Sequence, residues 1–315
     1  MSQIVHILTQ NSRRSPWYAF FAGWGLYVLS MLLFLVLVPS LLALLFGFSA
    51  TEMQAITGGQ AEISDAGMWM LRLFQGSNQL LTWGLVGAFM VFLMGYLPEE
   101  LAAARRPEGY AAGLAMLTML LSLPLVAFLT LSPDAFELPA FLAGLESWMR
   151  DMEEVSQGML ERMLHGNLLV LAGNIVTLAL IPAVCEELFF RGFLQRNMAR
   201  MMGPHTAVWL TAAIFSLVHL QFYGFFARLL LGGLLGYFFY GSRSLIPAVA
   251  AHFIFNLSSV LLASAAFNTS WIDPEMVRSD SYELPWGLVV VSALAVTGLT
   301  FHYLQRAPQV SRGLS

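Results

Sequence analysis

The chain has 315 residues, of which 58% are hydrophobic and only 11% are charged, and its mean hydropathy is +0.70. Soluble domains contain about 45–50% apolar and about 25% charged residues, so this composition excludes a soluble globular protein and indicates an integral membrane protein. The formal net charge is −4, all fifteen basic residues are arginine, and the single cysteine, Cys185, excludes an intramolecular disulfide. We expect membrane lipid as a partner, and no nucleic acid.

Apolar runs long enough to cross a bilayer recur along the chain. They predict eight membrane-spanning helices, at residues 17–48, 79–97, 111–131, 168–193, 206–220, 225–240, 244–267 and 286–304. The acidic segment 132–167 carries apolar residues at helical spacing, which predicts an amphipathic helix in the membrane interface. The predicted fold class is therefore all-α: a polytopic integral membrane protein with about eight transmembrane helices in one bundle, forming a single domain over residues 1–315.

The arginines are distributed asymmetrically about these spans. Arg72, Arg150, Arg162 and Arg278 lie on one side, together with most of the acids, and Arg228 lies near that side. Because basic loop residues are concentrated on the cytoplasmic side of membranes, we expect both termini in the cytoplasm and residues 132–167 outside it. The ten arginines that define the cytoplasmic side are Arg13, Arg14, Arg105, Arg106, Arg191, Arg196, Arg200, Arg243, Arg306 and Arg312.

The fourth predicted span contains two adjacent carboxylates, Glu186 and Glu187, followed by Arg191. An ionisable group at membrane depth costs roughly 2.5–3.5 kcal/mol on insertion scales and usually marks function. Successive helical residues lie about 100° apart, so the two glutamates cannot share one face. Glu187 and Arg191 are four apart and can form a structural ion pair. Glu186 is then the carboxylate without a partner in its own helix.

Three further polar residues lie in predicted spans. His219 is near the end of the fifth, and His252 and Asn256 are four apart on one face of the seventh. With Glu186 they make four polar groups on three helices that lipid would reject, so we expect them to face the bundle interior or a wet cavity. A carboxylate and an imidazole around a water are the minimum needed for hydrolysis, with neighbouring donors to stabilise the oxyanion.

Other interpretations of these groups stay open. Buried Asn, His and Glu can simply bond helices together, at about 0.6 kcal/mol on average, and Asn174 is better explained in this way. The same groups could relay a proton or ion in a transporter, or belong to a non-catalytic membrane scaffold. Transport predicts internal repeats with paired broken helices, and we find no such repeat. We expect Arg228 to extend to the outer interface, and Gly232 with Gly236 to allow close helix packing.

Three motifs together resemble the type II CAAX prenyl endopeptidase family, also called CAAX proteases and bacteriocin-processing enzymes. They are Glu186-Glu187-Leu-Phe-Phe-Arg191, Phe215-Ser-Leu-Val-His219 and His252-Phe-Ile-Phe-Asn256, on the fourth, fifth and seventh predicted helices within residues 168–262. The resemblance implies an intramembrane endopeptidase, here in a bacterial inner membrane, acting on membrane-associated proteins or peptides from a cavity open to the cytoplasm. It assigns Glu186 as general base, His219 as a second group that activates the water, and His252 with Asn256 as holders of the water or oxyanion.

The resemblance leaves the metal question open, because the family is described both as metalloproteases and as metal-independent glutamate proteases. Glu186, His219 and His252 could ligate Zn²⁺, but the His-Glu-x-x-His helix of many zinc proteases is absent. The sequence gives neither the physiological substrate, nor whether it is prenylated, nor the oligomeric state.

Helical rise places the predicted site residues at different depths. His219 lies roughly 20 Å above the cytoplasmic start of its span, whereas Glu186 lies about 27 Å along its own span, near the cytoplasmic face. These residues can meet only if the helices are tilted, entered at different depths or broken, for example at Pro182.

Overall fold

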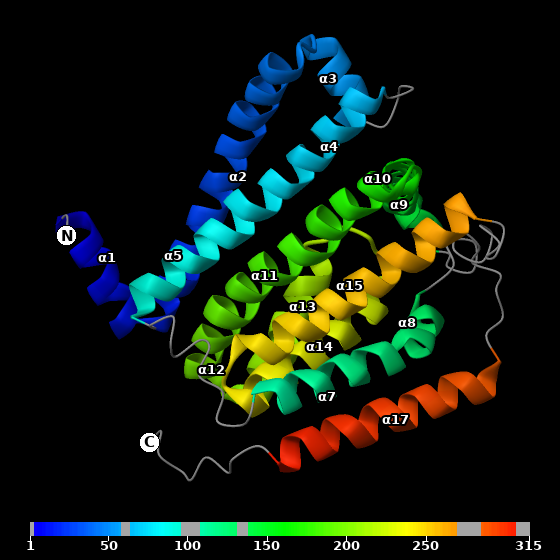
Figure 1. The fold of residues 1–315 in the computed structure, drawn as a ribbon. Coiled ribbons are helices and arrows are strands. Elements are labelled where there is room, and N and C mark those ends of the chain that lie inside the picture. The colour runs from blue at the N-terminus through cyan, green and yellow to red at the C-terminus, as the bar shows by residue number, and fades with distance from the viewer. Residues whose placement is uncertain (1–2, 58–63, 96–107, 131–137, 270–284, 307–315) are drawn as a thin grey trace.

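The computed structural model describes residues 3–57, 64–95, 108–130, 138–269 and 285–306. These residues are 90% helical, and none of them is in a strand, which confirms the predicted all-α class. Figure 1 shows the helices as a tilted bundle. Going across it, the pair formed by α2 and the α4–α5 helix is followed by the α10–α12 helix, then α15, α7 and α17, with α13 and α14 behind the centre.

The first half of the chain forms α1 (Gln3–Arg14), α2 (Pro16–Phe46), α3 (Ala50–Thr57), α4 (Asp65–Asn78), η1 (Gln79–Gly84), α5 (Leu85–Met94), α7 (Glu108–Leu121), α8 (Leu123–Leu129), η3 (Ala140–Leu142) and α9 (Ala143–Leu164). The second half forms α10 (Leu168–Asn174), η4 (Ile175–Leu180), α11 (Ile181–Glu187), η5 (Leu188–Gln195), α12 (Arg196–Met202), α13 (Pro204–Leu217), α14 (Phe225–Ser242), α15 (Leu245–Asn268) and α17 (Trp286–Gln305).

Local sequence signals set the ends of the longest single helix, α2. The Ser15 hydroxyl accepts a hydrogen bond from the backbone N–H of Tyr18, and Pro16 occupies the first turn, where its missing N–H is harmless. Gly47 ends the helix with φ +73° and donates its N–H to the carbonyl of Ala43. An apolar helix of 31 residues with both ends capped can cross a bilayer with tilt to spare.

The described residues contain six helices long and apolar enough to span a membrane, or seven if the bent pair α7–α8 is one span. This falls short of the eight predicted, and the unmatched prediction is 206–220. It corresponds to α13, which has 14 residues and therefore rises about 21 Å, less than the roughly 30 Å of a hydrocarbon core. The pair α7–α8 bends by 46° at Ser122, so the third predicted span is broken.

Two of the spanning helices are longer than the apolar runs that predicted them. The second helix begins at Asp65 instead of Gln79, and the fourth runs from Leu168 to Met202, a length of 35 residues. Polar residues inside the bundle explain the first difference. Arg72 is buried, and it donates to Asn174 Oδ1 at 2.8 Å and to the carbonyl of Met163 at 2.7 Å. Helix bonding by Asn174 is thus present, as its sequence context favoured.

Three π-helical segments interrupt these two long helices: η1 in one, and η4 and η5 in the other. Wide turns of this kind are rare and occur often at functional sites. The two helices meet at small residues. A Cβ on Gly87 would lie 2.7 Å from the backbone nitrogen of Phe189, and one on Gly84 would lie 2.7 Å from Cys185 Sγ. This backbone-level approach fixes η1 beside α11, where the two glutamates lie.

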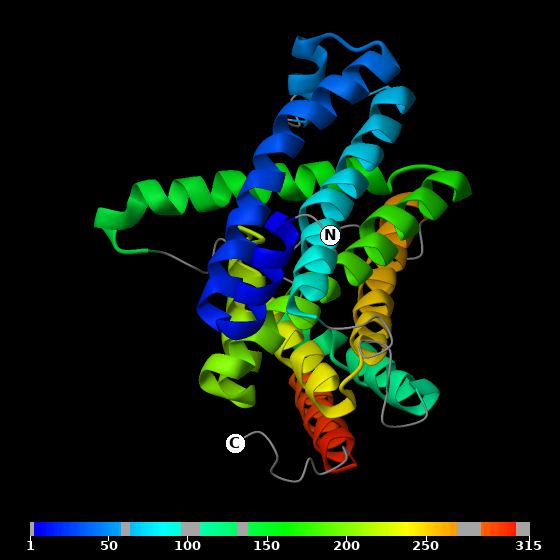
Figure 2. The same cartoon turned by 90° about the vertical axis from the view of Figure 1, so that its left-hand side faces the viewer.

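The predicted amphipathic helix in the acidic segment is present as α9, which lies across the direction of the spanning helices (Figure 2). Its start is fixed by Glu146, whose carboxylate accepts from the backbone N–H of Leu138 and from Arg150. These two hydrogen bonds hold the pKa of Glu146 below its usual range. Its location at a membrane interface stays a prediction.

Two hydrophobic cores pack on either side of the glutamate pair. One is centred on Phe189, Phe190 and Phe193 of η5, packed against Trp83 and Met90. The other joins Met119 of α7 to α14, α15 and Tyr303 of α17. On its other side α14 packs closely against α13 through small residues, because a Cβ on Gly232 would lie 3.0 Å from Ala212 and one on Gly236 would lie 2.9 Å from Val208.

Candidate functional site

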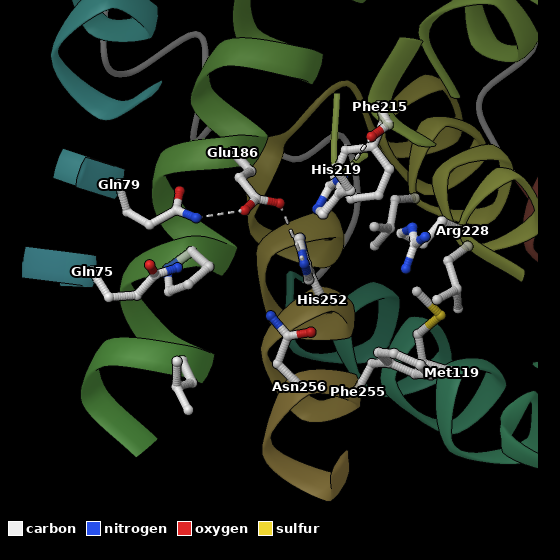
Figure 3. Close-up of a pocket in the computed structure, with 14 residues that line it drawn as sticks. Gln75, Gln79, Met119, Glu186, Phe215, His219, Arg228, His252, Phe255 and Asn256 are labelled. Atoms are coloured by element: carbon white, nitrogen blue, oxygen red, sulfur yellow. Dashed lines mark hydrogen bonds and ion pairs between the residues drawn. The ribbon is translucent and has the colours of Figure 1, made fainter. Parts of the chain in front are cut away.

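The carboxylate of Glu186 lies at the centre of the bundle, 5% exposed, at the nineteenth position of the 35-residue α10–α12 helix. Gln79 of η1 donates from its side-chain amide to Glu186 Oε1 at 3.0 Å (Figure 3). Sequence reasoning missed Gln79, because it stands at the border of an apolar run, where a polar residue looks like the end of a span. The signal that could have found it is the cluster Arg72, Gln75 and Gln79 at helical spacing on one face.

Glu187 and Arg191 form the ion pair that their spacing allowed. Arg191 Nη1 lies 2.6 Å from Glu187 Oε1, and both side chains are fully buried. Arg191 also donates from Nη2 to the backbone carbonyl of Gly232 at 2.9 Å, which ties η5 to α14. Its guanidinium lies over the ring of Phe215, 5.2 Å from the centroid.

His252 of α15 joins the two glutamates. Its Nδ1 lies 2.9 Å from Glu187 Oε1, and its Nε2 lies 3.8 Å from Glu186 Oε2. Because a carboxylate oxygen only accepts, we assign the proton to Nδ1, which leaves the lone pair of Nε2 directed towards Glu186. Glu187 therefore holds an imidazole as well as a guanidinium, a second contact that its helical spacing could not indicate.

His219 lies after the end of α13, in the connection to α14, and not in a span as predicted. Its Nδ1 donates to the backbone carbonyl of Phe215 at 2.6 Å, so its Nε2 is also left with a lone pair. The next residue, Leu220, has φ +55°, a left-handed conformation that is strained for a bulky side chain and is often found at functional sites.

This placement removes the conflict between the depths predicted for Glu186 and His219. Glu186 is not at the cytoplasmic end of its helix, because the helix continues for 16 residues beyond it to Met202. The short α13 ends inside the bundle, and His219 follows it at the level of the glutamate. Phe215 packs against both imidazoles, with ring centroids 4.8 Å from that of His219 and 6.0 Å from that of His252.

Glu186, His219, His252 and Asn256 all line one cavity of about 280 Å³. This is far more than the 10–15 Å³ that a single water requires. Six helices and the α13–α14 connection contribute to its wall. The other lining residues are Gln75, Gln79, Met119, Leu178, Pro182, Phe215, Arg228, Leu231, Leu235 and Phe255. Figure 3 shows Asn256 one turn below His252 on the same face of α15.

Arg228 contributes to this wall as well, which corrects the expectation that it extends to the outer interface. The side chain folds back over Gly224, where an added Cβ would lie 2.7 Å from Nη1. Gln221 accepts from both terminal nitrogens, through its side-chain oxygen at 3.0 Å and through its backbone carbonyl. Gln221 in turn donates to Ser156 of α9 at 2.6 Å, so α9 braces this corner of the cavity.

The cavity residues do not converge as a metal site. Within residues 3–57, 64–95, 108–130, 138–269 and 285–306, no group of three His, Cys, Asp or Glu side chains is close enough to hold a metal ion. The Glu186 carboxylate also has an amide donor, Gln79, on one of its oxygens. The predicted Zn²⁺ set of Glu186, His219 and His252 therefore does not fit a three-ligand site in this geometry, and we derive no step through a metal.

A buried carboxylate, two imidazoles and an amide thus line one cavity in a bundle of apolar helices, and groups of these types can carry out acid–base chemistry. Residues 168–258 match the family described as Rce1-like type II CAAX prenyl endopeptidase, which confirms the predicted resemblance. The match begins with α10, ends in α15 and includes Glu186, His219, His252 and Asn256. It supports a membrane endopeptidase of the CAAX-protease type. No curated protein and no solved structure matches the chain.

Proposed function

We propose that the chain is an intramembrane endopeptidase in which Glu186 is the general base that activates water for attack on a peptide bond. The observation that carries this proposal is the pairing of Glu186 with His252 across the cavity, Oε2 to Nε2, at 3.8 Å. This separation is too long for a direct hydrogen bond. It is short enough for one water to lie within about 2.8 Å of both atoms, where each can accept one of its two protons.

His252 is held ready for this water by its partners. The Nδ1–H bond to Glu187 fixes the tautomer and the orientation of the ring. Arg191 pairs with that carboxylate at 2.6 Å in a fully buried position. Glu187 is thus a positioning residue in the proposal, in addition to the structural role predicted for it with Arg191.

The remaining polar groups supply the other needs of peptide hydrolysis. His219 presents Nε2 to the cavity and can contact the water from a second direction. Asn256 lines the cavity, and its NH₂ group is a suitable donor to the oxyanion that forms on the carbonyl oxygen. We therefore assign Glu186, His252 and His219 to the water, and Asn256 to the oxyanion.

Glu186 both accepts a proton from the water and later gives it up, so no proton is left over. The water oxygen forms a bond to the carbonyl carbon while Glu186 takes one water proton. The tetrahedral intermediate then collapses, the carbon–nitrogen bond breaks, and Glu186 returns the proton to the leaving amine.

We propose a membrane-associated protein or peptide as substrate, reached from the cytoplasmic side of a bacterial inner membrane. The distribution of arginines supports this orientation. Arg13, Arg200, Arg243 and Arg306 belong to helix ends on one side of the bundle, whereas Arg72 and the arginines of α9 lie towards the other (Figure 1).

The direct test is cleavage of a peptide library by protein purified in detergent, with products identified by mass spectrometry. Glu186→Gln keeps the shape and an acceptor for Gln79, so it should fold normally and lose about 10²- to 10⁴-fold in activity. The matched control is Glu154→Gln, which removes an exposed carboxylate on α9 and should cleave like the wild type. A folded Glu186→Gln variant with full activity would overturn the assignment of the base.

A further inference from the structure

One charged side chain of the cavity has no part in the proposed mechanism. Arg228 lines the wall, and Figure 3 shows its guanidinium across the cavity from Glu186 and Gln79. Its two terminal nitrogens each donate to an oxygen of Gln221, and its Nε has no hydrogen-bond partner among the residues that the structure describes. A guanidinium has five N–H groups; Nε is itself buried, so the second N–H of each terminal nitrogen remains for a ligand.

No carboxylate neutralises this charge at contact distance in the described part of the chain. Glu153 of α9 interacts with Arg228 electrostatically, but among the described residues the two side chains form no ion pair within 4.0 Å. Both hydrogen-bond partners of Arg228 are neutral oxygens of one residue. An arginine that merely joined helices in an apolar setting would be expected to have an acidic partner, as Arg191 has.

The position of Arg228 strengthens its positive field. It lies in the first turn of α14, an 18-residue helix whose cap residue, Gly224, provides no side-chain hydrogen bond. Helix N-termini attract anions, so the helix and the guanidinium act in the same direction. The wall beside Arg228 is apolar, formed by Met119, Leu231 and Leu235. Low polarity makes a charged hydrogen bond at this corner stronger than in water.

We propose that Arg228 is a specificity-determining residue that binds a carboxylate of the peptide substrate, while Glu186 and His252 hold the scissile bond on the other side of the cavity. Gln221, fixed through Ser156, is the positioning residue that keeps the guanidinium in the cavity wall. This inference rests on the proposed peptidase function and adds to it the chemistry of the substrate. The carboxylate can come from a peptide C-terminus or from an Asp or Glu side chain.

The experiment compares matched peptides, starting from those that the wild type cleaves in the library. Each is made with its C-terminus as free acid or amide, and with internal acids kept or replaced by amides. The wild type should cleave one carboxylate form about 10- to 100-fold better in kcat/KM than its amide partner, the range expected for a hydrogen bond to a charged group. The arm that shows the preference identifies the source of the carboxylate.

Arg228→Gln should abolish that preference and Arg228→Lys should restore part of it, whereas a loss of structure alone would lower cleavage of both partners equally. The control is Arg150→Gln, which removes an arginine paired with Glu146 on α9, outside the cavity, and should keep the preference. An unchanged acid-to-amide ratio in Arg228→Gln, or no preference in the wild type, would overturn the role of Arg228. Absence of any cleavage by the wild type would instead contradict the proposed peptidase.

Discussion

The fully buried pair Glu187–Arg191 allows the stability of the site to be separated from its chemistry. Glu187→Gln leaves the Arg191 cation with only neutral acceptors, and Arg191→Met leaves the Glu187 anion without its guanidinium. Each single change removes one partner of a buried ion pair and should therefore cost about 3–5 kcal/mol. Independent effects would sum to about 6–10 kcal/mol in the double variant.

The double variant Glu187→Gln with Arg191→Met has no unpaired charge at this position. Its remaining losses are the hydrogen bond of Arg191 to the carbonyl of Gly232 and the weaker acceptor offered to His252. At about 1 kcal/mol per neutral hydrogen bond, we expect a total of about 1–3 kcal/mol. The coupling energy between the two sites should then be at least about 3 kcal/mol.

Activity should not recover with stability. Glu187 Oε1 also accepts from His252 Nδ1, and a neutral glutamine holds the Nδ1–H tautomer less firmly than a carboxylate does. The double variant should therefore melt above both single variants but some degrees below the wild type, and it should still cleave peptides more slowly per folded molecule. Unfolding in detergent and cleavage of one peptide by the same preparations measure both properties. Additive destabilisation would refute the ion-pair reasoning, and full activity in the double variant would refute the role assigned to the His252 contact.

Three further predictions concern the metal, the orientation and the backbone strain. Because the cavity residues do not converge on a metal site, peptidase activity should survive treatment with a chelator; loss with recovery on adding zinc would contradict this. Glu154→Cys in a Cys185→Ala background should react with an impermeant maleimide from outside intact cells, since Glu154 is exposed whereas Ser156 is bonded to Gln221; reaction only after lysis would invert the topology. Leu220→Gly should match or exceed the wild-type melting temperature, because relief of about 1–2 kcal/mol of left-handed strain outweighs a cost of about 0.5–1 kcal/mol in backbone entropy. Leu220→Val keeps the strain and should melt at a lower temperature. The reverse order of melting temperatures would show that the backbone at φ +55° is not strained.

Composition and helical spacing were sufficient to predict those features of the protein that depend only on residues close together in the sequence. Apolar runs identified the membrane class and most spans, because a bilayer imposes a length and a polarity on each helix separately. The 100° step between Glu186 and Glu187 separated their directions, and the four-residue spacing of Glu187 and Arg191 allowed their ion pair. Three short motifs were sufficient for the resemblance that residues 168–258 confirm.

Hydropathy was a poorer guide where polar residues are buried by other helices. It ended the fourth span at residue 193, although the helix runs to Met202, and it assigned α13 as a span although its 14 residues are too few. The sequence of a segment does not show whether lipid or protein surrounds it. Arg72 was therefore placed outside the predicted span, although in the structure its side chain is buried inside the bundle.

Only the tertiary structure decided which side chains act together. Gln79 and Glu186 are 107 residues apart, and Glu187 and His252 are 65 apart, so no local pattern could have paired them. The first contact depends on the close approach of the α4–α5 helix to the α10–α12 helix at Gly84 and Gly87. The place of His219 beside Glu186 depends in turn on where α13 ends. The same packing turns Arg228 into the cavity instead of towards the lipid headgroups, because Gln221 and Ser156 of α9 hold its guanidinium there.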